Sequence, residues 1–195
     1  GGSMKGFWVA LTAIFVVCLL WRPVQAQTAS EPASLLITEV YYNTPGSDGD
    51  EEWIEIANVG TAVIDLSAYK VGDEEMMGGG EGMVRFPEEA RIEPGQAVVV
   101  AQTAVGFRHL FGHNPDFEIR DTDPAVPDMR PYLIWASGDL ALSNEGDEVL
   151  LVERTAVRDS LSYGDSTFFF QPAINNVLTG HSIERVPADC DTDSA

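Results

Sequence analysis

Basic side chains are scarce in this sequence. The 195 residues include only 11 Lys and Arg against 31 Asp and Glu, a formal net charge of −20 at pH 7. All 31 acidic residues and 9 of the basic ones follow Ala26, so that part of the chain carries −22. A surface this acidic repels the phosphates of nucleic acids and of anionic lipids. The composition therefore argues against nucleic-acid binding, and indicates either a surface adapted for solubility or an affinity for divalent cations.

Cysteine is almost absent. Cys18 lies in the apolar N-terminal run, and Cys190 is the only other cysteine. If the N-terminal run is removed, no disulfide can form within the remaining chain. The apolar core must then supply the stability of the fold.

Only one long apolar run occurs, and it lies near the N-terminus. Phe7 to Leu20 is apolar except for Thr12, and Val24 and Ala26 supply the small residues that a signal peptidase requires. The alternative is a membrane anchor, but Gly6 to Trp21 is shorter than the roughly 20 residues that span a bilayer. We therefore expect a secreted or cell-surface protein with no membrane contact after cleavage. The expected parts are an expression scar (1–3), a signal peptide (4–26), a linker (27–34) and one domain (35–195).

Short β-branched and aromatic runs, separated by turn residues, dominate the chain from Leu35 onward. They predict about seven to nine strands and one helix, Thr103 to Phe111, an arrangement typical of a sandwich or barrel. We expect a mobile glycine-rich loop over Asp73–Gly82 and a long surface excursion over Asn114–Arg130. Leu133–Trp135 is predicted as a strand, and Leu140–Leu142 as the first strand of a hairpin with Val149–Val152.

Several segments in a fixed order resemble the lamin tail domain of secreted bacterial proteins. They are Leu36–Val40, Asp50–Asn58, Ile64–Tyr69, Ile92–Gln96, Leu140–Asp147, Asp159–Asp165 and Gly180–Pro187. The resemblance implies an all-β, immunoglobulin-like β-sandwich with one short helix, long acidic loops and no catalytic apparatus of its own. It also implies a protein that accompanies nucleases, hydrolases or adhesive modules outside the cell.

Catalytic patterns are missing. His109 and His113 are four residues apart, but Gly112 interrupts their helix and no H-E-x-x-H motif is present. No G-x-S-x-G motif supplies a serine nucleophile. We predict that the protein is not an enzyme and uses no catalytic cofactor.

Calcium is the one cofactor that the sequence suggests. Asp48, Asp50 and Glu51 lie in a flexible acidic segment, and Asp191 and Asp193 alternate near the other end. Hard cations bind to several carboxylate oxygens on adaptable loops, and Asp121–Asp123 is a weaker candidate of the same kind. The alternative is a solvated acidic surface with no bound ion.

Two other features concern contacts. Phe168, Phe169 and Phe170 cannot all face one core from a strand, so they either contact a partner or close the open end of the sandwich. Glu39 and Glu55 lie inside apolar strands, and we expect them to point outward on different edges.

These features together predict a secreted, non-catalytic module for protein–protein interaction, including self-association, or for extracellular scaffolding. One alternative is a calcium-binding adhesive or filament subunit. Another is an accessory domain of a secreted nuclease or hydrolase.

The predicted signal peptide can be tested by mass. Expressed with an export pathway, the protein should accumulate outside the cytoplasm with an intact mass that begins at Gln27. Replacing the small residue before the cleavage point, Ala26→Arg, should retain the precursor mass. A wild-type exported protein that still carries Met4 would contradict the assignment.

Overall fold

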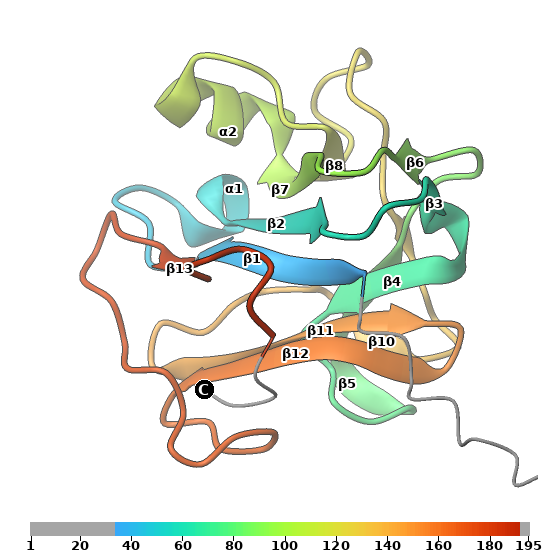
Figure 1. The fold of residues 1–195 in the computed structure, drawn as a ribbon. Coiled ribbons are helices and arrows are strands. Elements are labelled where there is room, and N and C mark those ends of the chain that lie inside the picture. Colours follow the sequence, from blue (N-terminus) through green and yellow to red (C-terminus); the bar gives the residue numbers. More distant parts are fainter. Residues whose placement is uncertain (1–33, 192–195) are drawn as a thin grey trace, which may run out of the picture. The chain divides into compact units, whose positions relative to one another are not determined.

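Alternating apolar and polar side chains build two facing sheets. In the computed structural model, which describes residues 34–191, the sheets form two layers (Figure 1). This confirms the prediction of an all-β, immunoglobulin-like sandwich. The predicted expression scar and signal peptide, and the linker before Ser34, lie outside the described residues.

The first sheet has five strands in the order β13-β1-β2-β7-β8. All neighbours are antiparallel except β7 and β8, which are parallel. The strands are β1 (Leu35–Tyr41), β2 (Trp53–Asn58), β7 (Ala97–Thr103), β8 (Phe117–Arg120) and β13 (Ile183–Glu184).

The second sheet has the strand order β10-β5-β4-β11-β12, with the short β9 also paired to β5. Only β10 and β5 run parallel. The strands are β4 (Tyr69–Gly72), β5 (Gly79–Arg85), β9 (Arg130–Pro131), β10 (Ala136–Gly138), β11 (Gly146–Glu153) and β12 (Ala156–Gly164).

Smaller elements connect the sheets. A two-stranded ribbon joins β3 to β6, and three short helices lie in the connections. They are β3 (Ile64–Asp65), β6 (Arg91–Ile92), α1 (Asp48–Glu51), the 3-10 turn η1 (Leu66–Ala68) and α2 (Ala104–Phe111).

The main core lies between the two sheets. Inward side chains from both layers form one cluster, including Ile37, Ile56, Val100, Val149 and Leu151. Each of them is buried from solvent. Since burial of apolar surface contributes about 25 cal/mol per Å², this interior supplies the stability that the described chain does not obtain from disulfides.

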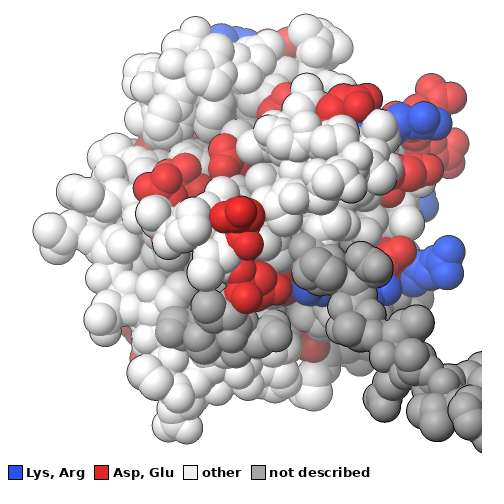
Figure 2. All heavy atoms as spheres, in the orientation of Figure 1, with Lys and Arg blue, Asp and Glu red and all other residues white. Residues whose placement is uncertain are grey.

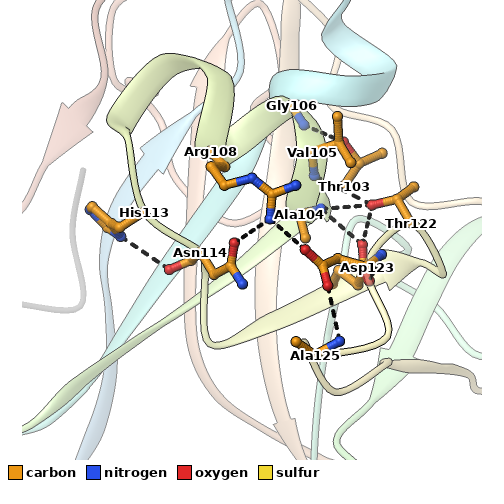
Figure 3. A network of polar contacts seen from close by, with 11 residues as sticks. Thr103, Ala104, Val105, Gly106, Arg108, His113, Asn114, Thr122, Asp123 and Ala125 are labelled. Atoms are coloured by element: carbon orange, nitrogen blue, oxygen red, sulfur yellow. Dashed lines mark hydrogen bonds and ion pairs between the residues drawn. The ribbon is translucent and has the colours of Figure 1, made fainter.

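Helix α2 forms where the sequence predicts it. Thr103 caps its start by accepting a hydrogen bond from the Gly106 N–H at 2.9 Å, and Gly112 ends it in the left-handed conformation. Figure 3 shows how the following loop is tied back to the helix: Arg108 donates to Asn114 at 2.6 Å and also binds Asp123. The helix and the loop after it are therefore one fixed unit.

Buried carboxylates hold the segment before β11. The consecutive backbone N–H groups of Ala141–Ser143 donate to three different side chains: Asp73 at 2.8 Å, Glu52 at 3.2 Å and Asp147 at 2.8 Å. All three carboxylates are buried. Because these acids come from three separate parts of the chain, the amides tie those parts together at one end of the sandwich.

The prediction of a mobile loop over Asp73–Gly82 is wrong. Its second half belongs to β5, and β10 lies parallel beside it. A Cβ atom at Gly82 would lie 2.0 Å from the Leu140 nitrogen, and one at Gly138 would lie 2.0 Å from the Gly80 oxygen. The glycines therefore permit two backbones to approach closely, where we had expected them only to add flexibility.

The predicted surface excursion over Asn114–Arg130 is partly internal. It contains β8, and Phe117 packs edge-to-face on Phe86 with ring centroids 5.2 Å apart. Val126 and Met129 are buried as well. The prolines and acids of this segment concealed the apolar positions, which are too irregularly spaced to give a strand pattern.

Two predicted strands are not strands. Leu133–Trp135 is a turn in which the Trp135 N–H donates to the Tyr132 carbonyl. Leu140–Leu142 has no regular secondary structure and is held by the buried carboxylates, and the partner of β11 in the hairpin is β12. Within residues 34–191, every helix is too short or too polar to cross a bilayer.

Burial of these carboxylates makes folding depend on pH. Burial, the largest cause, raises the pKa of Glu52 to about 8 and that of Asp73 to about 7, and it also raises the pKa of Asp147. Between their ordinary pKa and these raised values, the folded protein holds protons that the unfolded chain has lost. Stability therefore falls as pH rises from about 4 to about 8, by up to about 1.4 kcal/mol per pH unit for each titrating carboxyl.

We accordingly expect a higher melting temperature at pH 5.5 than at pH 8.5. Glu52→Gln keeps an acceptor for Leu142 and cannot ionise, so it should reduce this difference and stabilise the fold at pH 8.5. The exposed Glu88→Gln is the matched control and should change neither. Calorimetry measures these melting temperatures. Equal melting temperatures at the two pH values, or a larger difference for Glu52→Gln than for the wild-type protein, would contradict this account.

Candidate functional site

The predicted calcium ligands near the N-terminus lie on the short helix α1. Their three carboxylates have separate local contacts, and Asp48 also accepts a hydrogen bond from Asn144 at 2.7 Å. The nearest local partners of Asp48, Asp50 and Glu51 are, in order, the Thr44 hydroxyl at 2.8 Å, the Arg120 guanidinium at 3.9 Å and the Gly46 amide at 3.0 Å.

Of the two predicted ligands near the C-terminus, the structure describes only Asp191, which does not form a carboxylate group with them. Asp191 lies 3.6 Å from the Arg185 guanidinium, and Asp193 lies outside the described residues. Two other groups bring three carboxylates within 4.8 Å over residues 34–191. They are Glu74, Glu75 and Glu81, and Glu118, Asp121 and Asp128. Calcium binding at the sequence-predicted residues therefore stays a prediction.

The histidines make no contacts of a catalytic kind. His113 Nδ1 lies 3.0 Å from the Asn114 carbonyl oxygen, and His181 Nδ1 lies 3.3 Å from that of Thr179. All three histidines, His109 included, are exposed. His113 follows the end of α2, so the two neighbouring histidines do not share a helix.

The structure separates the three consecutive phenylalanines. Phe168 is 51% exposed, while Phe169 packs on an apolar cluster at the outer side of the second sheet. Phe170 lines a groove at the edge of the sandwich. The run thus follows the end of β12 and contributes to two different surfaces.

The first of these surfaces is apolar. It consists of Met76, Met77, Leu133, Ile134 and Phe168, which we call the apolar face; each is between 51% and 72% exposed. Trp135, the residue after Ile134, belongs to a second buried cluster with Met83, Ala136, Leu150 and Val152, and Phe169, the residue after Phe168, packs against it. Large apolar side chains exposed this strongly on neighbouring loops are uncommon on isolated domains and typical of contact surfaces.

Hydrogen bonds hold the loops of the apolar face in place. The Gly78 N–H donates to the Trp135 carbonyl at 2.6 Å, and the Trp135 indole N–H donates to the Glu74 carbonyl at 2.9 Å. The backbone N–H of Phe169 donates to the Ser162 hydroxyl at 3.3 Å, and the Ser166 hydroxyl donates to the Glu148 carboxylate. Because of these hydrogen bonds, the exposed side chains project from a fixed backbone.

The acid at this end of β11 is also perturbed. Burial, the largest cause, and then the nearby Glu75 raise the pKa of Glu148 to about 8.

The second surface is a groove of about 300 Å³, which we call the edge groove. It lies where β1 and β13 of one sheet face β12 of the other, and both β13 and β12 are the last strands of their sheets. Its apolar lining includes Leu161, Phe170, Ile174 and Ile183. Glu39 and Glu184 also line it.

The prediction that Glu39 and Glu55 point outward on different edges is wrong. Glu39 lies directly opposite Glu55 on β2 and directly opposite Glu184 on β13, so three glutamates form one cross-strand row. Figure 2 shows acidic side chains near the middle of this side of the domain, where Figure 1 places β1 and β13. Sequence alternation places each residue on a face of its strand, but only the register between strands reveals the row.

Comparisons with known proteins agree with the fold. The family model described as Lamin Tail Domain matches residues 28–165. No curated protein matches the sequence significantly. A solved structure of a DUF4876 family protein from Bacteroides thetaiotaomicron VPI-5482 is similar, with a TM-score of 0.51 and 14% sequence identity. The similarity covers 70% of this chain and 55% of that one, and at this identity it concerns the fold alone.

A thermal-shift experiment tests the calcium prediction. If the α1 carboxylates bind calcium, millimolar CaCl₂ should raise the melting temperature more than MgCl₂ at equal ionic strength, because Mg²⁺ keeps its waters. Asp50→Asn with Glu51→Gln should remove that excess, whereas Glu88→Gln with Glu93→Gln should not. Equal shifts with the two cations would indicate a solvated acidic surface instead.

Proposed function

The chain belongs to the lamin tail domain family, and we propose that it is a secreted, non-catalytic β-sandwich module that binds a protein partner in an extracellular scaffold. The lamin tail domain is a non-enzymatic, immunoglobulin-like family. In such folds, function resides in surfaces and loops added to a common framework.

The observation that carries this proposal is the apolar face. Leu133 and Ile134 are 72% and 70% exposed at the tip of a turn, although Trp135, the next residue, is only 5% exposed. A turn adapted only for solubility would place polar residues at these two positions. A partner that covers these aliphatic side chains removes their apolar surface from water, and this burial contributes to affinity.

The rigidity of this surface supports the same role. Its turn and loop are held by the Trp135 and Gly78 hydrogen bonds, so little conformational entropy is lost when a partner binds. The acidic residues Glu75 and Glu81 lie close by, in the carboxylate group that also contains Glu74. This charge favours a partner with a neutral or basic surface around its apolar contact.

Site-specific photo-crosslinking tests the proposal. A benzophenone amino acid at position 134 should give a discrete crosslinked product in cells that produce the protein, and the same amino acid at position 178 should not. Leu178 is the matched control because it is 77% exposed on a different segment. Mass spectrometry would identify the partner, and binding would then be measured with both proteins purified.

With that partner, Leu133→Ser and Ile134→Ser together should weaken binding by at least about tenfold, because two apolar anchors are lost. The melting temperature should not fall, because neither side chain is buried. Val105→Ser with Leu178→Ser removes comparable exposed apolar surface elsewhere and should leave the affinity unchanged. Equal affinity in all three proteins would reject the apolar face as the binding surface.

A further inference from the structure

The edge groove offers a second surface, independent of the apolar face. It opens between β13 and β12, and the two surfaces lie on different sides of β12, with Phe169 packed toward one and Phe170 lining the other. Six apolar side chains line the groove, among them Leu161 and Ile174. Its volume of about 300 Å³ is at the lower end of the range for ligand-binding clefts and suits a few side chains of a peptide.

The acidic row along the groove is electrostatically unfavourable in the free protein. Glu184, Glu39 and Glu55 are in direct cross-strand register, where side chains stand about 5 Å apart and like charges destabilise a sheet. Over residues 34–191 these three carboxylates form no ion pair with Lys, Arg or His. Burial, opposed by a hydrogen bond from Ser182 and reinforced by Glu55 and Glu184, raises the pKa of Glu39.

Arg185 is the one cation among the described residues that line the groove, and its charge is already neutralised. Arg185 donates to both carboxylate oxygens of Asp159 at 2.9 Å, and it lies 3.6 Å from Asp191. The same Asp159 accepts the backbone N–H of Ile37 at 2.7 Å, and the Arg185 Nε–H donates to the Ile37 carbonyl at 2.9 Å. This pair fixes β12 against β1 and β13, and it leaves the glutamates as the uncompensated charge of the groove.

The backbone at the groove also suits an extended ligand. Residue Ile174 forms an isolated parallel bridge to Tyr163, and its N–H donates to the Ser162 carbonyl at 2.9 Å. Beyond this bridge, the part of β12 before Ser162 has no strand paired with its outer edge in the described chain. Edges of this kind accept an additional strand from another protein.

We propose that the edge groove binds an extended segment of a partner protein in which Lys or Arg alternates with apolar residues. The apolar side chains enter the groove beside Leu161 and Ile174, and the cations meet Glu39 and Glu184. Charge complementarity selects this occupant, because an anionic segment would add to the repulsion and a neutral one would leave it unrelieved.

Three labelled pentapeptides serve as probes of the purified full-length protein: alternating valine and lysine, valine and glutamate, and valine and serine. Fluorescence anisotropy at 50 mM salt should detect binding of the lysine peptide, and at least about fivefold weaker or no binding of the other two. Amide NMR shifts on adding the lysine peptide should be confined to the elements that line the groove, which are β1, β12, β13 and residues 170–190.

Variants assign the contact to the groove. Glu39→Gln with Glu184→Gln should weaken binding of the lysine peptide by at least about fivefold, because two charge pairs are lost. Glu88→Gln with Glu93→Gln removes the same charge from other exposed positions and should have little effect. Ser160→Trp places a large ring in the groove and should abolish binding, with the melting temperature as the check on its folding.

Three outcomes of the peptide experiments would overturn the proposal. They are no binding of the lysine peptide, equal binding of all three peptides, and shifts that lie on the apolar face. A concentration-dependent dimer that Ser160→Trp disrupts would instead assign the groove to a second copy of the chain, which also overturns it. Since Leu133→Ser and Ile134→Ser leave the groove unchanged, failure of this inference and failure of the proposed function are separately observable.

Discussion

A chain with many acids and few bases must bury carboxylates without enough cations to pair them, and this constraint shapes the whole domain. Seven acidic residues are buried in the described chain: Glu52, Asp73, Glu74, Glu118, Asp147, Glu148 and Asp159. Only Asp159 forms an ion pair. The others accept hydrogen bonds from backbone N–H groups and hydroxyls, as Glu118 does from the Ala104 and Asp123 amides at 2.8 Å. An unpaired buried charge costs several kcal/mol, and two features of this domain reduce that cost. Amide donors take the place of absent Lys and Arg, and burial raises the pKa of Glu52 to about 8 and that of Asp73 to about 7, which keeps these groups protonated at lower pH.

The binding of buried carboxylates by backbone amides explains why the long connections are ordered. A carboxylate that binds two amides from another segment fixes the backbone of that segment, as Asp73 does by accepting from both Gly82 and Ala141. Loops that composition alone would describe as flexible therefore become part of the framework. The surfaces built on them, the apolar face in particular, project from positions that the fold determines, and rigid presentation of this kind favours specific contact over general adhesiveness.

Local pattern predicted the elements but not their neighbours. The strands around Leu35, Trp53, Val98 and Val157 and the helix capped by Thr103 follow from residue type and spacing, and the structure has them close to the predicted bounds. The glycine-rich first part of β5 was predicted as a loop because its partner β10 lies more than 50 residues away, and close backbone approach leaves no apolar signal. The glutamate row was missed for a related reason: alternation fixes a face, whereas only strand register brings Glu39, Glu55 and Glu184 into line. The apolar face was predicted only in part. The Phe168–Phe170 run indicated a possible contact surface, but Leu133 and Ile134, which are exposed in a turn, were predicted to lie in a strand.

Asp159, the one buried acid of the described chain that forms an ion pair, lies at the edge where the two sheets meet. Asp159 and Arg185 connect β12 to the segment that follows β13, and both also bind the Ile37 backbone, so one ion pair joins three chain segments. Because the scarce arginine is used there, the neighbouring glutamates of the edge groove have no cation from residues 34–191. Since Arg185 is already paired with Asp159, a basic group from another molecule would supply the counter-charge for these glutamates. The scarcity of Lys and Arg therefore has two effects. Backbone amides bind the buried carboxylates, and a basic segment of a partner is the ligand that complements the edge groove.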